Sequence, residues 1–133
     1  MNMDHLNVWA ILAAAVSAFL IGGLWYSPVL FGRAWERANG LNESPQASLK
    51  VFVLSFLLSL VMAVNLAFFL NDAKTTAAWG AIAGFLAGFG WAAMGLAIVA
   101  LFERRPAKYS LINGGYLTVA LTLMGLILGA WRK

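Results

Sequence analysis

The chain has 133 residues, 62% of them hydrophobic and 11% charged, and its mean hydropathy is +0.83. Soluble domains carry roughly 45–50% apolar and roughly 25% charged residues, so this composition is typical of an integral membrane protein. The formal net charge is +4, and the absence of cysteine excludes disulfides, thiolate metal sites and cysteine nucleophiles. No basic patch lies on a soluble face, and we expect no nucleic-acid partner.

Four stretches of the chain carry no charged residue in their interior, and each is long enough to cross a membrane, which takes ~20 apolar residues in a helix. They are continuously apolar and lack the alternation of barrel strands, so helices are predicted. We expect residues 1–133 to form one all-α transmembrane domain, a four-helix bundle with a short interfacial amphipathic helix after the first span. The expected spans cover about 6–26, 49–70, 76–102 and 109–131.

The end of the first span and the residues after it read GGLWYSPVLFGRAWER, from Gly22 to Arg37. Pro28 lacks the backbone donor that a continuing helix would need, so the first helix is predicted to end there. Apolar residues then recur at helical spacing with arginines opposite, which predicts a short helix along the interface and an elbow in the chain. The elbow is either a structural membrane exit or a surface for a lipid headgroup or partner helix. Its candidate binding residues are Trp25, Tyr26, Ser27, Pro28, Arg33, Trp35 and Arg37.

Small residues recur four positions apart in all four spans, and such residues let helix backbones approach closely in a membrane. This pattern predicts a compact bundle. It also leaves open a partner in a second copy of the chain or in another membrane protein. The candidate packing residues are Gly22, Ser55, Ser59, Gly80, Gly84, Gly88, Gly125 and Gly129.

Two amides, Asn65 and Asn113, lie inside the spans, where an amide is costly unless it is paired. They either form hydrogen bonds between helices or line a path for a small solute or ion. The spans hold no ionisable side chain in their interior, and the lone His5 has no partners for a metal site. We therefore expect a non-enzymatic membrane component without metal or cofactor, acting as a structural or accessory subunit or binding membrane lipid. The alternative is a small oligomeric channel.

The basic residues predict the orientation, because cytoplasmic loops favour Lys and Arg. Six of them flank the first and third connections and three lie on the other side, so both termini are expected outside. The six are Arg33, Arg37, Lys50, Arg104, Arg105 and Lys108, and the three are Lys74, Arg132 and Lys133.

The stretch LNVWAILAAAVSAFLIGGLWYSPVLFGRAWERANGL resembles the N-terminal pattern of the bacterial membrane family catalogued as domain of unknown function 1761. The pattern is an Asn and a Trp, then Gly-x-x-Trp-Tyr-Ser-Pro, then Phe-Gly-x-x-Trp. Val8 separates Asn7 from Trp9, where the family pattern has them adjacent. The stretch LINGGYLTVALTLMGLILGAW, which contains Asn113, is similar as well. The resemblance implies a small four-span protein of the bacterial cytoplasmic membrane, with no activity to carry over.

Overall fold

The structure, a computed structural model, describes residues 6–38 and 49–131, and all regular structure in these ranges is helical. The expected all-α bundle with four long apolar helices and a short helix after the first span is confirmed. The long helices begin and end within two residues of the expected spans. His5, Arg132 and Lys133 lie outside the described residues. In chain order the elements are α1 (Val8–Trp25), α2 (Gly32–Ala38), α3 (Leu49–Phe69), α4 (Ala77–Phe85), the π-helical η1 (Leu86–Ala93), α5 (Met94–Phe102) and α6 (Ala107–Ala130).

Side-chain caps begin two of these helices. The Asn7 side chain accepts hydrogen bonds from the backbone N–H groups of Trp9 and Ala10, at 2.9 and 3.3 Å, and thereby starts α1. Thr76 caps α4 in the same way, through the Trp79 N–H at 3.1 Å. Because the first N–H groups of a helix have no partner within it, each cap satisfies donors that would otherwise lie near the membrane unpaired.

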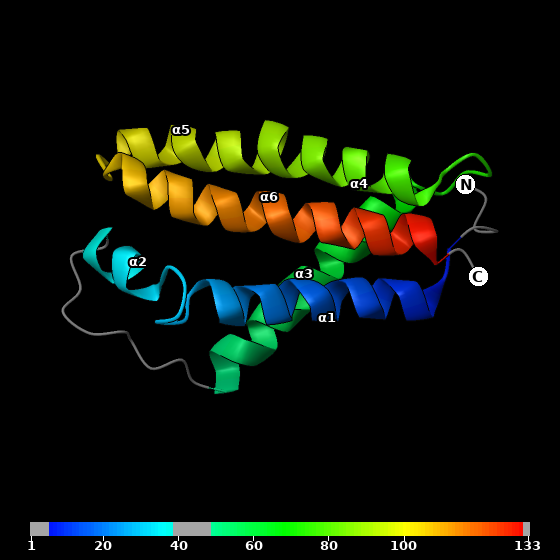
Figure 1. Ribbon diagram of the computed structural model, residues 1–133, viewed down its shortest axis with the longest axis horizontal. Helices are drawn as coiled ribbons and strands as arrows, with labels where there is room; N and C mark the ends of the chain where they lie inside the picture. The colour runs from blue at the N-terminus through cyan, green and yellow to red at the C-terminus, as the bar shows by residue number, and fades with distance from the viewer. Residues whose placement is uncertain (1–5, 39–48, 132–133) are drawn as a thin grey trace.

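The α6 helix is the centre of the bundle. It packs against α1 on one side and against α4 and η1 on the other, as Figure 1 shows. The α3 helix runs obliquely to the others and makes most of its contacts with α1. The core consists of small residues of α1 with larger side chains of α3 and α6, among them Leu66, Leu70, Met124 and Leu128.

The two chain ends described lie together at one end of the bundle (Figure 1), where the Asn7 amide donates to the Trp131 carbonyl oxygen at 3.4 Å. The α2 helix and the third connection lie at the opposite end. The third connection closes α5 with a Schellman motif, in which Arg105 N–H bonds to the Ala100 carbonyl and Arg104 N–H to the Leu101 carbonyl. Arg104 takes the left-handed position of this motif, with φ of 59°.

Five glycines lie where α4, η1 and α6 meet: Gly80, Gly84, Gly88, Gly125 and Gly129. A Cβ placed at Gly84 would overlap the Leu121 carbonyl group, and one at Gly80 would lie 3.0 Å from the Gly125 carbonyl carbon. A Cβ at Gly88 would lie 2.8 Å from the Thr118 Cα. The helices are therefore in backbone contact, which is the arrangement that small residues four positions apart permit. Gly125 and Gly129 face Gly80 and Thr76 from α6.

The other candidate packing residues differ in their surroundings. A Cβ at Gly22 would lie 3.3 Å from the Tyr116 ring, so this glycine makes room for an aromatic side chain. Ser59 is buried, and its hydroxyl donates to the Ser55 carbonyl oxygen at 2.9 Å. Ser55 itself lies on the exposed side of α3.

The π-helical segment η1 is a departure from the regular helix that a continuous apolar run predicts. Gly80, Gly84 and Gly88 are buried at intervals of four, but the next buried small residue, Ala93, follows after five. In a regular α-helix, two residues five positions apart lie about 140° apart around the helix axis. A π-turn instead brings residues i and i+5 onto one face of the helix. Ala93 thus stays against α6, with its Cβ 3.0 Å from a Cβ placed at Gly114.

Candidate functional site

The elbow after α1 is a tight backbone turn. The Phe31 N–H bonds to the Trp25 carbonyl at 3.0 Å and the Gly32 N–H to the Ser27 carbonyl at 2.9 Å, so α2 starts against the end of α1. A Cβ at Gly32 would lie 2.5 Å from the Tyr26 carbonyl oxygen. Only glycine fits this position, which explains the Phe-Gly pair of the elbow.

Two elbow side chains reach across to α6. The Trp25 indole N–H donates to the Ile112 carbonyl oxygen at 2.8 Å, and its ring lies against Gly115, where a Cβ would come within 2.9 Å. The Tyr26 hydroxyl donates to the Asn113 side-chain oxygen. Asn113 is therefore paired with a residue of another helix. It contacts the elbow, although it lies 87 residues after Tyr26 in the chain.

Aromatic rings complete this contact. The Tyr26 ring lies 5.5 Å from the Trp35 ring and 5.7 Å from the Tyr116 ring, and the Tyr116 hydroxyl donates to the Ala18 carbonyl oxygen at 3.0 Å. We call the set Trp25, Tyr26, Trp35, Asn113, Gly115 and Tyr116 the elbow joint. The Trp25 indole N–H, the two tyrosine hydroxyls and the Asn113 side-chain oxygen are bonded to one another or to the backbone, so what the joint does directly is join α1 and α2 to α6.

The remaining elbow residues face outward or bond locally. The Ser27 hydroxyl donates to the Leu24 carbonyl at 2.7 Å, and Pro28 is exposed. Arg33 and Arg37 are exposed on α2, on the side away from Trp35 expected of an interfacial helix. The third connection, which carries Arg104 and Arg105, and the first turn of α6, which carries Lys108, lie at the same end of the bundle as α2. Lys50 lies in the first turn of α3.

Asn65 is separate from Asn113, since it lies in the last third of α3 toward the opposite end of the bundle. Its side-chain N–H donates to the Val61 carbonyl of its own helix at 3.1 Å, and the residue is exposed. The hydroxyls of Ser59, Thr118 and Thr122 also bond to carbonyls within their own helices. The structure thus does not gather the amides and hydroxyls along one path through the described residues.

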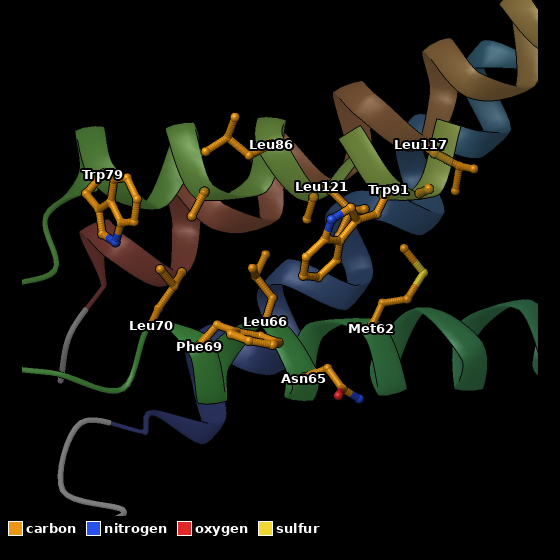
Figure 2. A pocket seen from close by; sticks show the side chains of 13 residues that line it. Met62, Asn65, Leu66, Phe69, Leu70, Trp79, Leu86, Trp91, Leu117 and Leu121 are labelled. Atoms are coloured by element: carbon orange, nitrogen blue, oxygen red, sulfur yellow. The ribbon is translucent and has the colours of Figure 1, made fainter. Parts of the chain in front are cut away.

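An apolar pocket lies between α3 and the α4–η1 segment, with α6 as its floor (Figure 2). Its volume is about 650 Å³. Phe69 and Trp91, whose ring centroids are 6.5 Å apart, stand at its rim, and both side chains are largely exposed. The lining residues are Met62, Asn65, Leu66, Phe69, Leu70, Trp79, Ala83, Leu86, Ala87, Trp91, Ala92, Leu117 and Leu121.

The pocket is not among the sites that the motifs of the sequence predict. One signal for it exists: Trp91 lies in the middle of a span, whereas Trp25, Trp79 and Trp131 lie near span ends, where membrane proteins place tryptophan. Asn65 contributes to the lining by its position, but Figure 2 shows its amide pointing away from the rings of Trp79 and Trp91. In residues 6–38 and 49–131, no group of three or more metal-ligating side chains comes together.

The four long apolar helices, of which α4–η1 and α6 are in backbone contact through glycines, define a multi-pass helical membrane protein. The family model described as "Protein of unknown function (DUF1761)" matches residues 9–129, and the chain belongs to this family. The resemblance found in the two ends of the sequence is thereby confirmed, and these two ends are the segments that meet in the elbow joint. No curated protein and no solved structure matches the chain.

Proposed function

We propose that this protein is a non-enzymatic membrane component that binds the apolar chain of a membrane lipid in the pocket between α3 and α4–η1. The observation that carries the proposal is the pocket itself, whose side chains are apolar apart from Asn65 and the two indoles. Ligand pockets in proteins measure roughly 300–1,000 Å³ and are mainly lined by apolar and aromatic side chains, so the pocket has the size and chemistry of such a site.

The position of the pocket favours a ligand that enters from the bilayer. Phe69, Leu86 and Trp91 at its rim are exposed on the outside of the bundle, so it opens sideways. Its lining on α4–η1 runs from Trp79 to Ala92, about 20 Å at the helical rise of about 1.5 Å per residue. Half of the hydrocarbon core is about 15 Å thick, so a chain lying in the pocket reaches from the membrane surface to the midplane.

The orientation follows from charge. The end of the bundle with Arg33, Arg37 and the third connection faces the cytoplasm of a bacterial cell, and both termini face outward. The exposed Arg33 and Arg37 then contact anionic headgroups of the inner leaflet. Trp79 marks the other end of the bundle, so the lipid chain in the pocket belongs to the outer leaflet. Enzyme and channel alternatives have less support, because the polar side chains bond locally and are dispersed.

The test is native mass spectrometry of the protein released gently from its own membrane, with bound lipids counted. Ala87→Trp fills the pocket, and Ala78→Trp adds the same side chain to an exposed position of the same span outside the lining. We expect lipid retention in the wild type and Ala78→Trp, and at least about tenfold less in Ala87→Trp, since a ring in place of a methyl group excludes the chain. Ala83→Phe fills the pocket with a smaller side chain at a second lining position. Equal retention in all variants, with helicity by circular dichroism unchanged, would refute the proposal.

A further inference from the structure

The α3 helix has one face in the core and one face without a partner in the described structure. Ser59, Ala63, Leu66 and Ala67 are buried against the bundle. At about 100° of rotation per residue, Leu54, Leu58, Val61 and Asn65 lie on the opposite side, centred away from Ala63. The exposed fractions of Leu54, Leu58 and Val61 are 48%, 66% and 57%.

Asn65 sets this outward face apart from an ordinary lipid-facing surface. It precedes the end of α3 at Phe69 by about 6 Å, inside the span, and its amide donates to the Val61 carbonyl of its own helix. A primary amide has two N–H donors and an acceptor oxygen, and one intrahelical bond leaves most of that capacity to be met elsewhere. In hydrocarbon, an amide without such partners is destabilising, so a helix face that carries one is stabilised by a polar partner at the same depth.

We infer that this face of α3 pairs with the same face of a second copy of the chain, with Asn65 opposite Asn65. Copies made from one sequence insert with the same orientation, so a two-fold axis along the membrane normal brings identical residues together at equal depth. Two amides placed in this way can exchange N–H···O bonds reciprocally, each acting as donor and acceptor. An unrelated partner has no such reason to present an amide at that depth.

The spacing of the face supports the same pairing. Leu54, Leu58, Val61 and Asn65 follow one another at intervals of four, three and four residues, the alternation of the seam in left-handed helix pairs. The seam carries no charge that would repel its own copy, and a single Asn in such a seam fixes register between helices. This inference goes beyond the lipid-binding proposal and is independent of it, since the Asn65 amide points away from the pocket rings (Figure 2).

The chain contains no cysteine, which makes disulfide mapping in native membranes direct. We would introduce Leu58→Cys and Val61→Cys on the seam, and Leu20→Cys on α1 as a control of similar exposure at 64%. Mild oxidation should convert the two seam variants to covalent dimers of twice the chain mass, and the control to about a tenth as much or less. Equal cross-linking of seam and control, or a seam product of a different mass containing another protein, would overturn the inference.

The role of the amide is tested on the Leu58→Cys background. Asn65→Leu should lower the dimer yield about tenfold, because it removes the amide hydrogen bonds between the two helices, while Asn65→Gln should retain most of it. Leu58 and Val61 lie outside the pocket lining, so lipid retention measured as above should be unchanged in Leu58→Cys and Val61→Cys, which separates this inference from the pocket proposal. If dimer yield is the same in Asn65→Leu and wild type, the amide does not hold the pair and the inference fails. If dimer yield persists but lipid retention falls, Asn65 contacts the lipid instead.

Discussion

Gly84 offers the sharpest test of the backbone contact between α4 and α6. In Gly84→Ala, the new methyl group would overlap the Leu121 carbonyl oxygen and lie 2.7 Å from its carbonyl carbon. The Leu121 carbonyl group belongs to the main chain, so it cannot move away by rotation as a flexible side chain could. The two helices must therefore move apart.

The size of the effect follows from the required separation. Non-bonded carbons sit about 3.5 Å apart at closest favourable contact, so relief of the carbon contact alone requires the helices to separate by at least about 0.8 Å. A gap of about 0.5–1 Å forfeits a quarter to a half of the dispersion energy across it, and overpacking costs about 1–3 kcal/mol. Alanine recovers about 0.5–1 kcal/mol of helix propensity over glycine. We expect a net loss of about 2 kcal/mol, roughly a 30-fold change in the unfolding equilibrium.

The assay is reversible unfolding in mixed micelles with increasing denaturing detergent, followed by circular dichroism. Gly95→Ala is the matched control, because a Cβ there meets nothing within 4 Å in the described structure. It should stabilise the protein by up to about 1 kcal/mol. Adding Gly125→Ala to Gly84→Ala should cost less than Gly125→Ala alone, since the helices have already separated. If Gly84→Ala and Gly95→Ala have the same stability, the backbone contact does not exist in the protein.

Two further predictions use the same unfolding assay. Tyr26→Phe and Asn113→Leu should each lower the free energy of unfolding by about 1 kcal/mol. The double variant should lose less than the sum of the two, because both substitutions remove one shared hydrogen bond. Strict additivity would show that the two side chains do not interact. Arg104→Gly should stabilise by about 1 kcal/mol, since it relieves a left-handed residue with a Cβ, whereas Arg105→Gly should bring no such gain. Equal changes at the two arginines would locate the effect in charge rather than in the backbone.

The spans could be predicted because the bilayer imposes their length and apolar composition on each helix separately. The caps at Asn7 and Thr76 and the proline after the first span are local signals too. The family resemblance could also be recognised from the sequence, because its motifs are short and well spaced along the chain. None of these features depends on how the helices sit relative to one another.

The partners of the elbow could not be predicted, because they depend on which helices become neighbours. Tyr26 and Asn113 are 87 residues apart, and each is a plausible polar residue in isolation. The pocket likewise depends on the oblique course of α3, which no residue pattern within α3 specifies. The π-helical segment could not be predicted from the spacing of small residues, because Ala92 continues the interval of four and only burial in the structure identifies Ala93 as the next residue against α6.

The elbow joint also has a consequence for how the protein is made. Trp25 and Tyr26 leave the ribosome 87 residues ahead of Ile112 and Asn113, their partners in the last helix. At translation rates of about 5–20 residues per second, the first helix waits about 4–17 s before its indole and hydroxyl groups can be bonded to α6. A chain that stops before the fourth helix never forms the joint. The bundle therefore closes only after both its first and its fourth span have been synthesised and inserted.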